Sequence, residues 1–343
     1  MPGQKIDERA CMTRRPQLVA ELASGQMPTE DSFALIEPRR ETPQGPVGQV
    51  LLFAARNVTW HARSGRLDLP DGSLAASLSG QGGRRDRPGP RLRLKRASLW
   101  LTPGARANYG HFLFDGMTGL NVLEATGIAE HFQPFTPRLS RWQRDLLTLG
   151  GLRAGPGFRS ATVEVEELVW LSSMNHYLHR NDGLLRDVVA RLPRAEAPGE
   201  EVLYLSRRGF TGRIMTNEPA LERALQARGV RILHPQRLSV AEQVSAMARA
   251  RMVIGPAGAA LANLVFLAPG ARVVELRPEP VNGPWIEIAC ANLGLRHHLI
   301  DAPETQDMRL SGHLAQLPRR LTGRYNVAYE VNIVAVLDRL GSG

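Results

Sequence analysis

The chain has 343 residues, of which 43% are hydrophobic and 22% charged, as is ordinary for a globular protein of about two domains. Its net charge is +10, and its two cysteines, Cys11 and Cys290, lack metal-ligand spacing, which favours a reducing compartment. The N-terminus has no apolar signal-peptide region and no window approaches ~18 consecutive apolar residues, so we expect a soluble, cytoplasmic protein.

The first half of the chain predicts an α/β domain with irregular insertions. Strands are expected at 49–53, 97–101 and 163–171, and helices at 109–124, 141–149 and 183–192. Pro198 and Gly199 mark a linker between two ordered stretches. We therefore place an N-terminal domain at 1–195 and a C-terminal domain at 196–343.

A basic segment at 79–96 supplies +6 of the net charge of +10. The simplest interpretation is a solvated loop that runs into a strand. The alternative is a patch for an anionic surface such as lipid headgroups, a polyanionic glycan or nucleic acid. No aromatic residue interleaves with the arginines, which disfavours single-stranded nucleic acid. The residues available for peripheral membrane contact are Arg84, Arg85, Arg87, Arg91, Arg93, Lys95 and Arg96.

The second half alternates strands with helices. Strands are expected at 201–206, 230–234, 251–255, 272–276 and 295–300, with helices at 217–229, 239–250, 258–267 and 284–294. Ser239 and Glu242 form a capping box for the second of these helices. The pattern predicts a doubly wound parallel sheet. A last helix at 326–340 is long enough to return to the N-terminal domain.

A glycine-containing turn follows the strand at 251–255. It carries Gly255, Pro256 and Gly258, and a helix begins directly after it. Backbone N–H groups and the helix dipole there favour an anion site, although a tight turn that only permits close packing is the alternative. Glu275, which ends the next strand, is a candidate acceptor for ribose hydroxyls. The spacing is neither a dinucleotide fingerprint nor a P-loop.

Five blocks, occurring in order, give the chain a family resemblance. They are N-Y-G-H-F-L-F-D (108–115), L-Y-L-S-R-R (203–208), R-I-M-T-N-E (213–218), A-E-Q-V (241–244) and G-P-A-G-A-A-L-A-N-L-V-F-L-A-P-G (255–270). Together they resemble glycosyltransferase family 61. The resemblance implies a GT-B architecture, with two Rossmann-like domains facing a cleft. It also implies inverting transfer of a hexosyl or pentosyl group from a nucleotide sugar to a glycan or lipid-linked acceptor. Bacterial members are associated with capsule, exopolysaccharide or lipopolysaccharide synthesis.

The chain departs from the family pattern at one position. Family members usually carry a histidine where this chain has Ala257. If that histidine contacts the donor diphosphate, its loss puts donor affinity or identity in doubt, and a catalytically degenerate transferase that only binds glycan or nucleotide becomes an alternative.

His111 and Asp115 are four residues apart, so they share one helix face. His111 is our first choice for the base that deprotonates the acceptor, with Asp115 holding the imidazole tautomer. The reverse assignment is chemically as sound, and a pair that merely satisfies two polar groups in a helix contact is a third interpretation. Asn108 and Tyr109 are assigned to the acceptor side, where Asn108 is equally suited to cap the helix.

Donor binding is assigned to the second domain. Arg207, Arg208 and Arg213 are expected on the leaving diphosphate, because a guanidinium meets two phosphate oxygens at once. Asn217, with Glu218, either caps the next helix or touches ligand. The rest of the donor set comprises Gly255, Gly258, Ala259, Ala260, Asn263 and Glu275, while Gln243 fits the family pattern or a solvent-facing position equally well.

We expect neither a metal nor another cofactor. There is no D-x-D at a strand end, and Asp68 with Asp71 reads as a turn. His176 and His179 lack further ligands, and His297 and His298 point to opposite faces of a strand, so all four are interpreted as structural.

Two other functions were weighed. The helices at 239–250 and 258–267 resemble a helix-turn-helix of a DNA-binding protein, but the second is almost wholly apolar and a strand separates them. We therefore expect no nucleic-acid partner. A nicotinamide-dependent oxidoreductase is disfavoured because the glycine fingerprint is missing.

Overall fold

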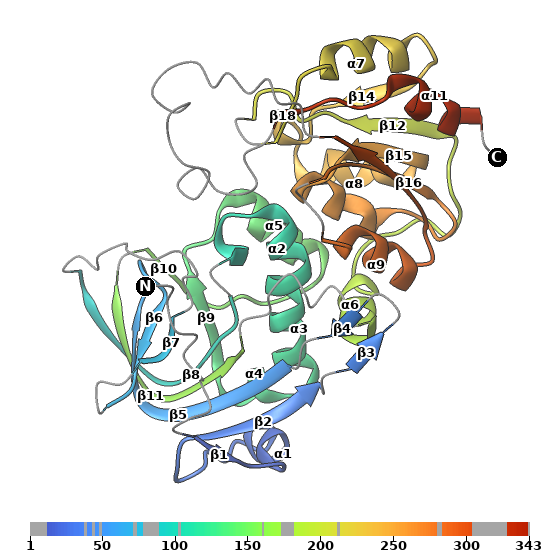
Figure 1. The fold of residues 1–343 in the computed structure, drawn as a ribbon. Coiled ribbons are helices and arrows are strands. Elements are labelled where there is room, and N and C mark those ends of the chain that lie inside the picture. Colours follow the sequence, from blue (N-terminus) through green and yellow to red (C-terminus); the bar gives the residue numbers. More distant parts are fainter. Residues whose placement is uncertain are drawn as a thin grey trace. The chain divides into compact units, whose positions relative to one another are not determined.

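The computed structural model (Figure 1) forms two compact units, Met1–Arg191 and Leu192–Gly343. Their boundary lies four residues before the predicted division at 195/196. The structure describes residues 12–37, 40–42, 45–47, 50–70, 74–77, 89–101, 104–159, 161–172, 182–210, 213–279, 283–303 and 328–341. The described residues form a mixed α/β structure, as predicted.

The first unit is built on a nine-stranded sheet among its described residues. In spatial order its main path is β1 (Thr13–Arg14), β2 (Ser32–Glu37), β5 (Val50–His61), β11 (Thr162–Leu171), β8 (Arg91–Leu99), β9 (Gln133–Pro137) and β10 (Gly157–Phe158). The strands β6 (Arg66–Asp68) and β7 (Leu74–Ser77) extend from β5, and β3 (Arg40–Thr42) pairs with β4 (Gly45–Val47). The three predicted strands correspond to β5, β8 and β11, each longer than or as long as expected.

This sheet is mixed, which corrects the expectation of a Rossmann-like first domain. The strand β5 runs antiparallel to both β2 and β11, whereas β11, β8, β9 and β10 are parallel to one another. Strands of an all-parallel sheet are covered on both faces and read as continuous apolar runs. The first six residues of β8 instead alternate between exposed and partly buried positions. One face of this part of the sheet is therefore open to solvent.

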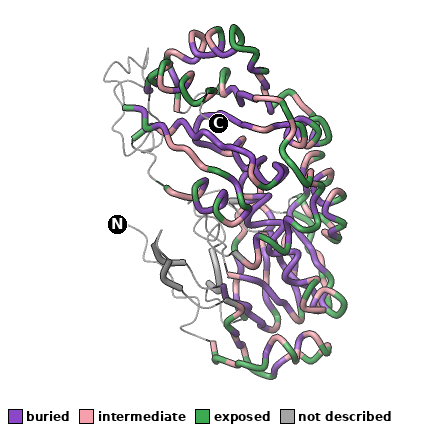
Figure 2. The backbone as a smooth tube through the Cα atoms, turned by 90° about the vertical axis from the view of Figure 1, so that its right-hand side faces the viewer, coloured by how far each residue is buried: buried purple, intermediate pink, exposed green. Residues whose placement is uncertain are grey.

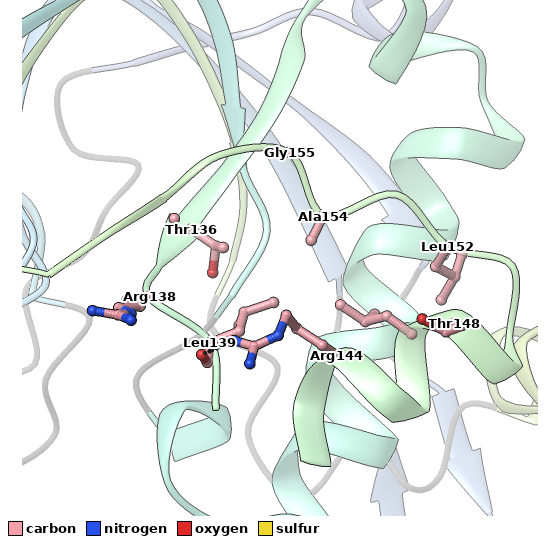
Figure 3. A pocket seen from close by; sticks show the side chains of 10 residues that line it. Thr136, Arg138, Leu139, Arg144, Thr148, Leu152, Ala154 and Gly155 are labelled. Atoms are coloured by element: carbon pink, nitrogen blue, oxygen red, sulfur yellow. Dashed lines mark hydrogen bonds between the residues drawn. The ribbon is translucent and has the colours of Figure 1, made fainter. Parts of the chain in front are cut away.

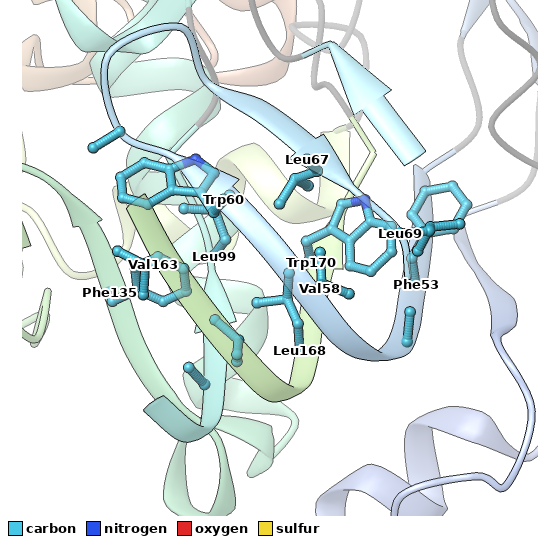
Figure 4. Close-up of a cluster of buried hydrophobic side chains, with 14 of the residues drawn as sticks. Phe53, Val58, Trp60, Leu67, Leu69, Leu99, Phe135, Val163, Leu168 and Trp170 are labelled. Atoms are coloured by element: carbon cyan, nitrogen blue, oxygen red, sulfur yellow. The ribbon is translucent and has the colours of Figure 1, made fainter. Parts of the chain in front are cut away.

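The core of the first unit lies on one face of β5, β8 and β11 (Figure 4). Phe53, Val58 and Trp60 extend from β5, and Leu168 and Trp170 from β11; all five are at most 1% exposed. The rings of Phe53 and Trp170 stack with centroids 5.2 Å apart. Apolar residues at alternate positions produce this face, because successive strand side chains point to opposite sides. The alternation shifts by one residue between Ala55 and Val58 of β5 and between Val165 and Leu168 of β11.

The basic residues of β8 are largely committed to the neighbouring strand. Arg93 Nε lies 3.0 Å from Glu164 Oε2, and Arg96 Nε lies 2.7 Å from Glu167 Oε2, in pairs that face each other across the sheet. Arg91 also reaches Glu164, at 3.5 Å. Cross-strand pairs of this kind neutralise part of the charge that a membrane contact would use. Arg84, Arg85 and Arg87 lie outside the described residues.

The described part of the first unit also contains several short helices. They are α1 (Leu18–Ala23), the 3₁₀ turn η1 (Gly104–Arg106), α2 (Tyr109–His111), the π-helical turn η2 (Phe112–Gly116), α3 (Met117–Ala125), α4 (Ile128–His131), α5 (Arg141–Leu149) and α6 (Asp182–Val189). The predicted helix at 109–124 is thus continuous through α2, η2 and α3, but it contains a π turn. The predicted helix at 141–149 is confirmed as α5, and α6 lies within the one predicted at 183–192 apart from its first residue.

The second unit contains the predicted parallel sheet. Its five strands lie in the order β14 (Arg231–Leu233), β12 (Glu201–Leu205), β15 (Ala250–Pro256), β16 (Arg272–Pro278) and β17 (Arg296–Ala302), and every neighbouring pair is parallel. In chain order these strands occupy positions 2-1-3-4-5. In this topology the strand order reverses between the first and third strands, and ligands bind outside the carboxyl ends of the strands at that point.

Helices and a short second ladder complete this unit. They are α7 (Glu218–Gln226), η4 (Pro235–Arg237), α8 (Val240–Ala248), η5 (Ala259–Phe266), α9 (Trp285–Asn292) and α11 (Ile333–Gly341), with β13 (Ile214–Met215) paired to β18 (Ala328–Tyr329). Figure 2 colours the chain by the burial of each residue. The strands β15 and β16 are buried over nearly their whole length. The predicted capping box is confirmed: Ser239 N–H donates to Glu242 Oε2 at 2.7 Å, and Glu242 N–H donates to Ser239 Oγ.

Two predicted helices of this unit are wrong in part. The segment after the glycine turn is the 3₁₀ helix η5, in which Asn263 Nδ2 donates to the carbonyl of Ala260 at 3.1 Å. This bond occupies the carbonyl that an α-helix would pair with Leu264 N–H, and such local bonds compete with α-helix formation. The helix predicted at 326–340 starts instead as strand β18, and α11 follows at Ile333.

The helix α11 contacts α7 and packs Val336 into the same apolar cluster as Leu221 and Tyr204. The supposed helix-turn-helix is also absent, because α8 and η5 are separated by the buried strand β15 of the parallel sheet.

In the part of the chain that the structure describes, no helix has the length and apolar character needed to span a bilayer. Cys11, Asp71, His176 and His179 lie outside the described residues.

Candidate functional site

The first candidate group lies on the helical segment α2–η2–α3. Asn108 begins this segment, and its Oδ1 accepts the N–H of His111 at 3.1 Å, so its capping role is observed. Nδ1 of His111 lies 2.7 Å from Oδ2 of Asp115. The carboxylate is part of the π turn, a local irregularity that occurs frequently at functional sites.

The two members of this pair differ in exposure and therefore in chemical role. The Asp115 side chain is 1% exposed and that of His111 is 16% exposed. Burial raises the pKa of Asp115 to about 6, although the hydrogen bond and charge of His111 act to lower it. Above that pH the carboxylate accepts the Nδ1–H of His111, which leaves the ring lone pair on Nε2. Only the imidazole reaches the surface, so this geometry suits His111 as the base and Asp115 as its orienting partner.

Aromatic contacts fix the backbone around this pair. The ring of Phe112 meets Trp142 edge-on, with centroids 5.2 Å apart, and also approaches Trp100. The ring of Tyr109 also packs against Trp142, with centroids 5.4 Å apart, and burial raises the pKa of its hydroxyl. Trp142 extends from α5, so this helix holds α2 and η2 in place. Its role could not be read from the sequence, because a lone tryptophan in a helix gives no sign of its partner.

The second candidate group lies at the topological switch point of the second unit. Ser206 and Arg207 follow β12, and Gly258 follows β15, the two strands between which the strand order reverses. A Cβ atom placed on Gly258 would lie 2.6 Å from Arg207 Nη1 and 3.4 Å from Arg213 Nη2. Both guanidinium groups therefore rest against the backbone of the glycine turn, which brings together three of the predicted donor residues.

A hydrogen bond to Glu218 holds the backbone of Arg207 in place. Its backbone N–H donates to Glu218 Oε1 at 2.8 Å, and the same oxygen accepts the hydroxyl of Tyr204 at 2.9 Å. Burial lowers the pKa of Arg207, and its guanidinium carbon lies 5.1 Å from the centre of the half-exposed Phe210 ring. The sequence favoured Glu218 as a helix cap; in the structure it is 4% exposed and positions the arginine backbone.

Arg213 has an unusual backbone conformation. Its φ of 54° lies in the left-handed region, which costs a non-glycine residue roughly 1–3 kcal/mol. The strained conformation belongs to a residue whose side chain lies at Gly258. Strained backbone conformations occur often at ligand sites, where contacts with the surrounding structure hold the residue in place.

Two of the predicted donor residues are engaged elsewhere. Arg208 Nη1 lies 3.0 Å from Glu222 Oε2 on α7. Asn217 uses both ends of its amide on Val331: Nδ2 donates to the carbonyl at 2.8 Å, and Oδ1 accepts the N–H at 3.2 Å. These contacts tie α7 to the segment before α11, so neither side chain joins the arginine pair at Gly258.

Glu275 and Asn263 are both fully buried. Glu275 Oε2 lies 2.9 Å from His297 Nε2 of the neighbouring strand β17. Asn263 Nδ2 donates to Gln243 Oε1 at 2.9 Å, so Gln243 does not face solvent as the alternative interpretation had it. In this structure Glu275 therefore contacts the neighbouring strand β17, and Asn263 contacts α8.

The glycine turn itself is tightly packed. A Cβ on Gly255 would lie 3.3 Å from Leu205 Cβ and Leu261 Cδ2, so this glycine permits close packing of β15. Ala257 is buried, and its N–H donates to the carbonyl of Leu276 at 2.8 Å. Ala259 and Ala260 open η5 and are half-buried. The first N–H groups of a helix have no partner within it, so this end of η5 is suited to an anion.

No group of three or more His, Cys, Asp or Glu side chains suited to a metal ion occurs in the described ranges. Among the same residues, the cationic groups at Gly258 are arginines, which bind phosphate oxygens directly.

Residues 109–274 match the model of a protein family described as Glycosyltransferase 61. The matched region begins at α2 and ends within β16, so it includes both the His111–Asp115 pair and the arginine pair at Gly258. No curated protein is significantly similar to the chain. The chain is therefore similar to glycosyltransferase family 61 over this region.

Proposed function

We propose that this chain, similar to glycosyltransferase family 61 over residues 109–274, transfers a sugar from a nucleoside diphosphate donor to a glycan or lipid-linked acceptor with inversion at the anomeric carbon. The family resemblance suggests bacterial surface polysaccharide as the product. The observation that carries the proposal is the convergence of Arg207 and Arg213 on Gly258 at the switch point of the parallel sheet.

The donor diphosphate would bind at this arginine pair. Two guanidinium groups provide forked donors for phosphate oxygens, and their positive charge stabilises the negative charge that develops on a departing diphosphate. The first N–H groups of η5 add backbone donors at the same turn. Burial of Arg207 strengthens its interaction with an anion, because the local dielectric is lower than in water.

The acceptor would be activated in the first unit. Nε2 of His111 takes the proton of the acceptor hydroxyl, whose oxygen then attacks the anomeric carbon. The bond from that carbon to the diphosphate oxygen breaks, and the nucleoside diphosphate leaves with the electron pair. Asp115 keeps Nδ1 protonated and stabilises the imidazolium. The reverse assignment, with Asp115 as the base, requires an acceptor to reach a carboxylate that is 1% exposed, so we favour His111.

The proposed reaction needs both groups of side chains, because His111 would activate the acceptor and the arginine pair would bind the donor. A kinetic comparison tests this requirement. Loss of His111 should lower the turnover number, and loss of Arg207 should raise the KM for the donor of the same reaction.

The first experiment is a calorimetric screen of UDP, GDP, ADP, CDP and dTDP against the full chain in the presence of EDTA. We expect one nucleoside diphosphate to bind, and its nucleotide sugar to be hydrolysed slowly in the absence of acceptor. Binding that appears only with Mn²⁺ would contradict the metal-free assignment. Binding without transfer to any acceptor would indicate a degenerate transferase, and tight, salt-dependent binding of duplex DNA would overturn the proposal.

A further inference from the structure

The first unit contains a cavity of about 320 Å³ (Figure 3), and neither His111 nor Asp115 is among the described residues that line it. It lies where the parallel strand β9 ends, next to one face of α5. This volume is at the lower end of the roughly 300–1,000 Å³ typical of small-molecule sites. The carboxyl end of a parallel strand is also where α/β proteins commonly bind ligands.

The wall opposite α5 is formed by the loop 152–157, which folds back on β9. Trp100 Nε1 donates to the carbonyl of Ala154 at 3.2 Å, and β10 pairs with β9 so that Gly157 faces Thr136. Gly155 has a φ of 67°, and a Cβ there would lie 1.6 Å from the carbonyl oxygen of Pro134. Only glycine allows this approach, so the backbone fixes the course of this loop along β9.

The polar side chains that line the cavity can donate hydrogen bonds, and each is either positively charged or neutral. Arg138 follows β9, and Arg144 extends from α5, with Thr148 one turn further along. None of the ten described residues that line the cavity is an aspartate or a glutamate. Arg144 Nη1 donates to the carbonyl of Leu139 at 2.7 Å, which holds its guanidinium group against the cavity wall. Two arginines without an acidic neighbour in the lining give the cavity a positive potential.

Thr136 closes the inner end of the cavity. The residue is 0% exposed, and among the described residues its Oγ1 makes no hydrogen bond. Figure 3 shows its side chain directed toward Leu139 and Arg144. A buried hydroxyl without a partner is costly, and native proteins rarely leave one unsatisfied. The hydroxyl is therefore available to donate to an oxygen atom that enters from the arginine side.

The remaining lining is apolar. Leu139, Leu147 and Leu152 are each at most 8% exposed and contribute side chains to the same space. A small inorganic ion would leave these carbons uncovered, whereas a ligand with a carbon framework would cover them. The lining thus combines an oxyanion site with an apolar wall, the usual composition of a small-molecule pocket.

We propose that this cavity binds a small organic molecule that carries a carboxylate or phosphate group, with the anion between Arg138, Arg144 and Thr136 and its carbon framework against the leucines. The site does not involve the arginine pair at Gly258, and its occupation is measured by binding alone. The proposal for this cavity can therefore be confirmed or rejected whether or not the chain is a transferase.

The test is calorimetric titration of the full chain with four probes: glucuronate, glucose 6-phosphate, inorganic phosphate and the neutral methyl glucoside. We expect the organic anions to bind more tightly than inorganic phosphate, and methyl glucoside not to bind. The comparison of glucuronate with glucose 6-phosphate identifies which anion the site prefers. Saturation with a nucleoside diphosphate should leave this binding unchanged, which separates it from the donor site.

Three variants and one control locate the site. Arg138→Gln and Arg144→Gln should each weaken binding by about tenfold or more, since each removes one charge-assisted contact. Thr136→Val, nearly equal in size, should cause a smaller loss. Arg141→Gln is the matched control, because Arg141 lies on the same helix with a side chain that is 90% exposed and does not line the cavity.

Near-native melting temperatures would show that the variants are folded. The Arg144→Gln variant loses the bond of Arg144 to Leu139. If that loss makes the variant unstable, Arg138→Gln and Thr136→Val still test whether the ligand binds in this cavity. Absence of binding by every anionic probe, or equal binding by Arg138→Gln, Thr136→Val and the native chain, would overturn the proposal.

Discussion

Nδ1 of His111 lies 2.7 Å from Oδ2 of Asp115, and the exposed fraction of the side chain falls from 16% at the imidazole to 1% at the carboxylate. The other carboxylate oxygen, Oδ1, is buried and makes no hydrogen bond within the described residues. Asp115 is therefore a poorly solvated anion whose described polar partner is the imidazole. This arrangement makes the pair sensitive both to substitution and to pH.

Replacement of His111 by alanine should lower the turnover number by roughly 10²–10⁴-fold, the usual contribution of a general base. Asp115→Asn should also slow turnover, since the amide no longer selects the required tautomer. Neither change should alter the affinity for a nucleoside diphosphate. Rates are measured by donor consumption, with Asp145→Asn as a control because that carboxylate is 44% exposed on α5. Near-native rates for both dyad variants would place the chemistry elsewhere.

The buried carboxylate should also make stability depend on pH. The pKa of Asp115 is about 6 in the folded chain against an ordinary 3.8, so between these values the folded state holds the extra proton. Stability from this group is present below about pH 4 and is lost as the pH rises through about 6. A shift of about two units corresponds to about 3 kcal/mol.

The measurement is the free energy of unfolding in urea for the native chain and for Asp115→Asn at pH 4 and pH 7.5. The native chain should lose stability relative to the variant as the pH rises. The same pair of measurements in a His111→Gln background separates the carboxyl from the imidazole. A difference that stays constant with pH would show that Asp115 titrates normally.

The two arginines at Gly258 should matter more for nucleotide binding than their neighbour. Arg207→Gln and Arg213→Gln should each weaken binding of the nucleoside diphosphate by about 10- to 100-fold, as expected from losing a charged hydrogen bond of about 1.5–3 kcal/mol. Arg208→Gln should have little effect, because Arg208 is paired with Glu222. Calorimetry on the three variants distinguishes the structure from the sequence-based prediction, which gave all three arginines the same role.

Gly258→Ala should weaken the same binding while leaving the fold stable. The φ of Gly258 is 164°, an extended conformation that alanine adopts freely. The new methyl group would lie 2.6 Å from Arg207 Nη1, the far end of a flexible side chain, so the guanidinium must move. We expect a nearly unchanged melting temperature and a loss of nucleotide affinity comparable to that of Arg207→Gln. Unaltered affinity would mean that the position of Arg207 against the turn is unimportant.

Gly155→Ala should destabilise the first unit much more than Gly127→Ala. Both glycines have left-handed backbone, with φ values of 67° and 78°. A methyl group at Gly127 meets nothing within 4 Å, so that variant has only the conformational cost of about 1–2 kcal/mol. At Gly155 the methyl group also collides with the backbone of Pro134. Urea unfolding of both variants provides the comparison, and equal losses would show that the loop 152–157 can move away from β9.

The sequence by itself determined the elements with strong periodicity and clear end signals. The five strands of the parallel sheet and the helices α7, α8 and α9 were predicted within a few residues because apolar runs alternate with capped amphipathic segments, as at Ser239 and Glu242. The spacing of His111 and Asp115 was sufficient to predict that they share a helix face, since helical periodicity is local. The glycine turn after β15 was also legible, because Gly255, Pro256 and Gly258 interrupt an apolar run.

Only the tertiary structure decided which polar groups meet. Arg207 and Arg208 are adjacent in sequence and chemically identical, yet one lies at Gly258 and the other on Glu222, because successive residues after a strand point in different directions. The mixed sheet of the first unit, the burial of Glu275 and the cavity beside α5 depend on strand pairing between residues far apart in the chain. Local propensity carries no information about such partners, so packing alone places them.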